Sequence, residues 1–88
     1  MIDMKYGQLV TWMGNRRGQS YRYVGIALDV IMAGEYLSDS KVVKEKGLKV
    51  KPENETSLYD RVLVYVSDRR NGLRGYFTPR LAKVMAEV

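Results

Sequence analysis

The sequence predicts a mainly β protein, a single small barrel of five short strands with a long insertion between the second and third strands and a short helical turn near the C-terminus. Its 88 residues are enough for one hydrophobic core, so we expect a single domain, 1–88. Short runs rich in β-branched and aromatic residues show the two-residue alternation of strands. Glycine, asparagine or proline separates most of these runs, as in small barrels.

The opening run, YGQLVTWMG at residues 6–14, is the first expected strand. Val10 and Trp12 would face one side of it, because side chains alternate along a strand. Gly14 then begins a loop, GNRRGQS at residues 14–20, whose glycines and asparagine accept positive φ angles. We expect this loop to present its two adjacent arginines to water.

The run YRYVGIALDVIM at residues 21–32 is the second expected strand. Apolar residues occupy alternate positions on one face: Val24, Ile26, Leu28, Val30 and Met32. Part of this pattern also fits a helix, but the β-branched residues and the internal Gly25 favour a strand. We expect Gly25 to mark a bulge or a sharp bend, as small barrels need where a strand crosses between sheets.

Residues 33–59 form a polar insertion with glycine and proline breaks. A β-hairpin turned at the EKG triplet is one conformation that the pattern allows. Two short apolar patches, Val42 to Val43 and Leu48 to Val50, are more than a pure spacer needs. The insertion is therefore either a partner-binding arm that orders on contact or a solvated loop.

The run DRVLVYVSD at residues 60–68 is the third expected strand and the clearest one. Three valines at alternate positions line one face, and Leu63 with Tyr65 lines the other. Apolar residues on both faces are typical of a strand that is buried on both sides.

The C-terminal part predicts a hairpin followed by a short closing element. Asn71 and Gly72 are the strongest short-range signal for a hairpin turn, and LRGYF at residues 73–77 is its expected second strand. Thr78 and Pro79 interrupt that strand. The remaining run, RLAKVMAEV, fits either a half-turn with a short strand or a short helix.

Catalysis is not expected from this composition. The chain has no cysteine and no histidine, which excludes disulfides, thiolate metal sites and the usual general base at neutral pH. We assign no catalytic residue, no metal ligand and no cofactor. Asp29 and Asp60 could face each other across neighbouring strands, but pairing of each with an arginine such as Arg22 or Arg61 is the commoner arrangement.

The formal net charge of +5 favours anionic partners. Its excess is arginine in two segments, residues 14–34 and 60–80. Arginines between aromatic residues can hold phosphates while tyrosine stacks on bases, or they can be solvated loop charges. We expect tyrosines 21 and 23 to be the most exposed aromatics. The candidate partner-binding residues are Arg16, Arg17, Tyr21, Arg22, Tyr23, Val42, Val43, Leu48, Arg69, Arg70 and Arg74.

The runs YGQLVTW, YVGIALDVI, DRVLVYVSD and GYFTPRLAKV together resemble the SH3-like barrels found among small tailed-bacteriophage proteins. The resemblance implies a helical turn at Pro79 to Leu81 and a fifth strand at Ala82 to Met85. Peptide-binding SH3 domains carry an acidic loop after the first strand, whereas this chain has arginines there and no second tryptophan. Recognition of polyproline is therefore not expected. The Val24–Gly25 pair also resembles the KOW element of RNA-associated barrels.

From these features we expect a non-enzymatic protein-interaction module, of the kind that serves as a small phage virion component or as a modulator of a host protein. The alternative is a basic nucleic-acid-binding module of KOW or SH3-like type. Open strand edges would allow a homodimer. No signal peptide or membrane span fits the sequence, so we expect an intracellular protein, in the host cytoplasm or in a virion.

Overall fold

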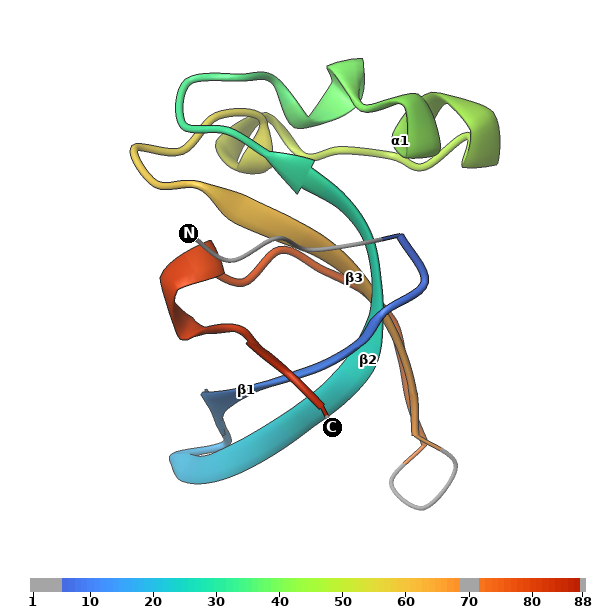
Figure 1. The fold of residues 1–88 in the computed structure, drawn as a ribbon. Coiled ribbons are helices and arrows are strands. Elements are labelled where there is room, and N and C mark those ends of the chain that lie inside the picture. Colours follow the sequence, from blue (N-terminus) through green and yellow to red (C-terminus); the bar gives the residue numbers. More distant parts are fainter. Residues whose placement is uncertain (1–5, 69–71, 88) are drawn as a thin grey trace.

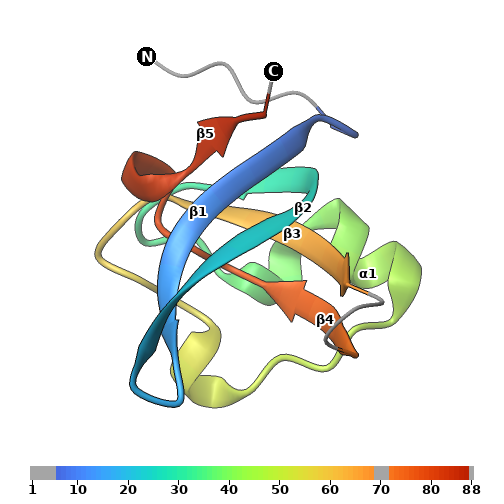
Figure 2. The ribbon, with the colours of Figure 1, turned by 90° about the horizontal axis from the view of Figure 1, so that it is seen from below.

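A computed structural model describes residues 6–68 and 72–87, whose regular structure is mainly β-strand (Figure 1). Its five strands make a single antiparallel sheet in the order β4-β3-β2-β1-β5 (Figure 2). The strands are β1 (Leu9–Arg16), β2 (Gln19–Ile31), β3 (Arg61–Asp68), β4 (Leu73–Phe77) and β5 (Met85–Ala86). The expectation of a mainly β protein is confirmed.

The first hairpin is longer, and its turn shorter, than the sequence predicts. The ladder between β1 and β2 continues to the pair Arg16 and Gln19, so the expected loop at residues 14–20 is wrong. Only Arg17 and Gly18 form the turn, with φ angles of 54° and 79°. A two-residue turn with positive φ at both positions matches the twist of the strands it joins. Gly14 lies inside the strand, where the Tyr23 ring occupies the space that a side chain would fill.

The bend in β2 lies beyond the glycine that was expected to mark it. Ala27 pairs with Val64 and Asp29 with Leu63, so the register shifts around Leu28 and not at Gly25. Because of the extra residue, the odd-numbered side chains of β2 face one side of the sheet before the shift and the other side after it. The predicted apolar face of β2 is therefore only partly buried: Val24 and Ile26 are exposed, and Leu28 is buried because residues of the insertion cover it.

The concave side of the sheet holds the main core. Its buried members are Val10, Trp12, Tyr23, Ala27, Val62, Val64, Val66 and Val84. The Trp12 and Tyr23 rings stack with their centroids 5.0 Å apart. The inward valines of β3 confirm one predicted face of that strand, and its opposite face is also covered.

The insertion covers that opposite face and forms a second core. It contains two single 3-10 turns, η1 (Leu37–Asp39) and η2 (Pro52–Asn54), and one short helix, α1 (Lys41–Lys46) (Figure 1). The buried residues of this core are Leu28, Ile31, Leu37, Val42, Val43 and Leu63. The insertion is thus neither an arm that orders only on contact nor a solvated loop.

The helix replaces the hairpin that the EKG triplet allowed. Gly47 adopts a left-handed conformation with φ of 63° directly after α1, and its N–H bonds back to Lys44 and Val43 carbonyls. A glycine in this conformation ends helices, which explains why the same triplet does not turn a hairpin.

The C-terminal segment follows β4 with one 3-10 turn, η3 (Leu81–Lys83), and the two-residue strand β5 beside β1. The expected turn at Pro79 to Leu81 and strand at Ala82 to Met85 are each displaced toward the C-terminus. Val84, between the turn and the strand, is fully buried in the main core. Asn71 of the expected hairpin turn lies outside the described residues. None of the described helices is long and apolar enough to cross a membrane.

Replacing Val43 by alanine should lower the free energy of unfolding by about 2 kcal/mol, because two buried methyl groups are lost and a small cavity remains. The neighbouring Lys44→Ala, which changes an exposed side chain, should stay within about 0.5 kcal/mol of the unchanged protein. Urea denaturation followed by circular dichroism measures both. Equal stability of the two variants would show that the insertion does not fold with the sheet.

Candidate functional site

A groove opens where β2 and β3 diverge. The ladder between these strands starts at Ile26, so the residues of β2 before it pair only with β1 among the described residues. On the other side of the opening, Val66 and Ser67 of β3 pair with β4. The two hairpins, β1–β2 and β3–β4, accordingly point in different directions from the bend of β2 (Figure 1). The open space between the two strands measures about 420 Å³.

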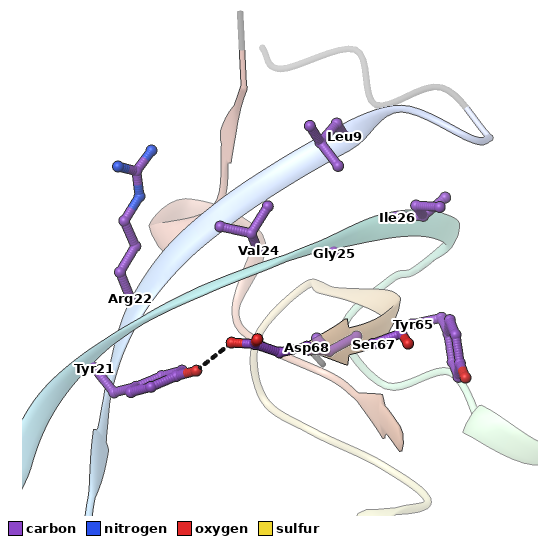
Figure 3. Close-up of a pocket in the computed structure, with 10 residues that line it drawn as sticks. Leu9, Tyr21, Arg22, Val24, Gly25, Ile26, Tyr65, Ser67 and Asp68 are labelled. Atoms are coloured by element: carbon purple, nitrogen blue, oxygen red, sulfur yellow. Dashed lines mark hydrogen bonds between the residues drawn. The ribbon is translucent and has the colours of Figure 1, made fainter. Parts of the chain in front are cut away.

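Exposed apolar side chains border this groove. Leu9, Val24 and Ile26 are 45%, 40% and 42% exposed, and all three line the groove. They lie close together on neighbouring strands, since Leu9 is directly opposite Ile26 in the β1–β2 ladder (Figure 3). Three aliphatic residues beside a concave opening are a surface that a partner can cover with gain of hydrophobic free energy.

Backbone groups of β2 also face the opening. Ala27 donates its N–H to the Gln8 carbonyl and accepts from the Gly7 N–H, both on the β1 side. Because successive residues of a strand direct these groups to opposite edges, the N–H and C=O of Val24 point away from β1 and toward the groove. The groove therefore combines an open strand edge with apolar side chains.

One side-chain hydrogen bond spans the groove. The Tyr21 hydroxyl donates to the Asp68 carboxylate over 2.8 Å, and so joins the diverging ends of β2 and β3 (Figure 3). This bond ties the two hairpins together at the far end of the opening. At the other end Gly25 lies against β3, where an added Cβ would be 2.6 Å from the Tyr65 carbonyl oxygen.

The arginines of the first hairpin lie at one end of this region. Arg16 places its guanidinium 5.6 Å from the centre of the Tyr21 ring, and Arg17 is exposed in the turn. Arg22 lines the groove, donates to the Thr11 hydroxyl and forms an ion pair of 2.7 Å with Glu87. These three predicted residues share one hairpin, but they do not form one patch. Arg16 lies on the face that carries Tyr21, whereas Arg22 is opposite Met13 on the other face.

The two tyrosines do not lie as expected. Tyr23 is buried in the main core, because odd-numbered residues of β2 point inward before the register shift. Tyr21 is half-buried against the same core. The expectation that both are exposed is wrong, and only Tyr21 reaches the groove.

The remaining predicted residues do not join the arginines of the first hairpin in the groove. Val42 and Val43 are buried and Leu48 is half-buried in the second core, so they pack against the sheet and do not form an exposed patch. Arg74 is exposed on β4, opposite Ser67. Arg69 and Arg70 lie outside the described residues.

The expected pairing of Asp29 and Asp60 with an arginine such as Arg22 or Arg61 is not found among the described residues. Asp29 accepts from the Ser40 hydroxyl over 2.6 Å and from the Val30 N–H, and Asp60 accepts from the Ala33 N–H. Both acids therefore fix the insertion to the sheet. Within the described ranges no group of three or more acidic side chains is arranged to hold a metal ion.

Sequence reasoning missed the apolar border of the groove. Val24 and Ile26 were placed on one apolar face together with Leu28 and were not singled out as exposed, and neither was Leu9. The small residues Gly25 and Ala27 on the alternate face were the available signal, because a strand buried against a barrel interior needs small side chains where strands approach closely. Comparison with known proteins finds no matching family model, no matching curated protein and no matching solved structure.

Proposed function

We propose that this protein is a non-enzymatic binding module that takes up an extended segment of a partner protein in the groove between β2 and β3. The observation that carries the proposal is the open edge of β2 beside the exposed side chains of Leu9, Val24 and Ile26. An extended peptide satisfies both features, since its backbone can bond to the strand edge while alternate side chains cover the apolar border.

We further propose that the sheet is an SH3-like barrel. The strand order supports this assignment, because β5, β1, β2, β3 and β4 are consecutive neighbours and β2 pairs with both β1 and β3. The single 3-10 turn between β4 and β5 is a second supporting feature.

Selection from a library of random ten-residue peptides, followed by affinity measurement, tests the proposed function. Selected peptides should shift the amide signals of residues 22–26, 66 and 67 in NMR spectra. Ile26→Lys should weaken their binding by about tenfold or more, because burying one unpaired charge costs well over 1.4 kcal/mol. Met32→Lys is the matched control, since Met32 is comparably exposed but does not line the groove.

Two results would count against peptide binding at this groove. One is that the selected peptides bind the Ile26→Lys variant as tightly as they bind the unchanged protein. The other is that the protein self-associates with rising concentration in sedimentation experiments and that Ile26→Lys abolishes this self-association. A second copy of this chain would then be the occupant.

Nucleic acid is the second candidate partner, and the position of Arg16 over the Tyr21 ring, next to the exposed Arg17 of the turn, favours it. In that case affinity for a single-stranded oligonucleotide should fall steeply between about 50 and about 200 mM salt, because contacts with phosphates release bound counterions. Replacing Arg16 and Arg17 by alanine should reduce the salt slope. Absence of binding at low salt would exclude this candidate.

A further inference from the structure

A second, polar pocket lies where the end of the insertion meets the start of β3 and the segment after β4. It measures about 340 Å³ and is bordered by residues 53, 54 and 56–59 together with Arg61, Thr78 and Arg80. Neither the apolar border of the groove nor the arginines of the first hairpin belong to it. It is therefore a separate feature of the surface.

Arg61 is a buried cation, and no counter-charge contacts it within residues 6–68 and 72–87. Only 5% of the residue is exposed, yet it lines the pocket. Its two terminal nitrogens donate to the carbonyls of Asn54 and Glu55, over 2.7 and 3.2 Å. Its Nε has no hydrogen-bond partner, and no carboxylate pairs with it among the described residues. A buried guanidinium that no carboxylate neutralises is costly, and an anion in the adjoining pocket would offset the cost of that charge.

Arg80 brings a second positive charge to the same place. Arg61 and Arg80 are direct partners in an isolated antiparallel bridge, so their side chains leave the backbone on the same side. The Arg80 guanidinium carbon lies 3.7 Å from the centre of the Tyr59 ring, which holds it at the rim of the pocket. Like charges in direct opposition repel each other, and a shared anion would convert this repulsion into attraction.

Hydroxyl groups complete the lining. The Ser57 hydroxyl oxygen accepts from the Tyr59 N–H, so its own hydrogen is available to donate. Thr56 and Thr78 also line the pocket. The single carboxylate in the lining is that of Glu53, an exposed residue that forms no ion pair with either arginine in this part of the structure. Two arginines against one glutamate leave the pocket with a net charge of +1.

We propose that this pocket binds an anionic oxygen group, the phosphate or the carboxylate of a ligand, between Arg61 and Arg80. The guanidinium groups supply charge-assisted hydrogen bonds and the Ser57 hydroxyl supplies a neutral one. The proposal does not depend on the groove between β2 and β3, because the two sites share no residue.

Titration with sodium phosphate, and separately with sodium acetate, tests the proposal when chloride keeps the ionic strength constant. Either anion should produce saturable shifts in the NMR signals of residues 54–61 and 78–80 and raise the melting temperature. Tighter binding of phosphate identifies a phosphorylated ligand, and equal or tighter binding of acetate identifies a carboxylate.

Three variants make the experiment decisive. Arg80→Gln should lower the affinity for the anion about tenfold, as expected for loss of one charge-assisted hydrogen bond. Glu53→Gln should strengthen binding, because the only acid of the lining is removed. Lys83→Gln removes a nearby exposed charge outside the pocket and should leave the affinity unchanged.

The proposal is overturned if neither anion gives a saturable response. It is equally overturned if Arg80→Gln and Lys83→Gln weaken binding to the same degree, since the effect would then be general attraction to a basic protein. Neither variant replaces a buried side chain, so folding of the tested proteins is preserved.

Discussion

Replacing Trp12 by alanine should lower the free energy of unfolding by about 4 kcal/mol, the range measured for removal of buried aromatic side chains. Trp12 is almost fully buried and stacks on Tyr23 with only 10° between the ring planes. It also contacts Phe77 at a centroid distance of 6.2 Å, and so links β1 to β4 across the main core. Removal of the indole would leave a cavity that none of these neighbours can fill without moving a strand.

Met13→Ala is the matched control for this change. Met13 follows Trp12 on β1 but points to the opposite side of the strand, where it is 54% exposed. Its replacement should alter the free energy of unfolding by no more than about 0.5 kcal/mol. Guanidinium denaturation monitored by circular dichroism measures both variants. A loss below about 2 kcal/mol for Trp12→Ala would mean that the sheet does not enclose one continuous core.

Replacing Gly25 by alanine should cost about 3 kcal/mol, although the change adds a single methyl group. A Cβ at this position would lie 2.6 Å from both the Tyr65 carbonyl oxygen and a Val64 methyl group. The carbonyl belongs to the backbone of β3, so the clash can be relieved only if the two strands separate. The same change should widen the groove at the point where β2 and β3 diverge.

Gly18→Ala separates this steric effect from the conformational effect of losing a glycine. Gly18 has a positive φ angle, but nothing lies within 4 Å of the position of an added Cβ. Backbone strain alone should cost about 1 kcal/mol there. In thermal unfolding, the melting temperature of Gly25→Ala should therefore be well below that of Gly18→Ala. The reverse order would contradict the close approach of β2 and β3.

The two proposed sites differ in what they would recognise. The groove beside β2 offers a strand edge and aliphatic side chains, and so suits a segment of protein chain. The pocket at Arg61 and Arg80 offers charge and hydroxyl groups, and so suits one anionic group. Ile26→Lys and Arg80→Gln act on separate residues, so the effect of each site on binding can be measured independently.

Several elements were predictable because their signals are local. The alternation in β3 predicted a strand buried on both sides, and the structure confirms it. The interruption of β4 at Thr78 and Pro79 also lies where the sequence placed it. Each of these depends on residues that are neighbours in the chain, so backbone preference and side-chain alternation suffice.

The face assignment in β2 and the fate of the insertion were not predictable in this way. Val24, Ile26 and Leu28 all face away from the main core, and only Leu28 is buried, because the insertion covers it and leaves the other two exposed. Val42 and Val43 could be placed only against Leu28 and Leu63, which are distant in the chain. Without that packing a six-residue helix has too few hydrogen bonds to be stable.

The sequence by itself determined the class of fold and the absence of histidine and cysteine chemistry, because composition and alternation depend on no distant contact. The tertiary structure alone decided which side chains surround each site. Arg61 faces Arg80 because the segment after β4 returns beside the start of β3. Val24 and Ile26 line a groove because β2 leaves β3 at Gly25. Both arrangements are products of strand pairing between segments far apart in the chain, which no local pattern encodes.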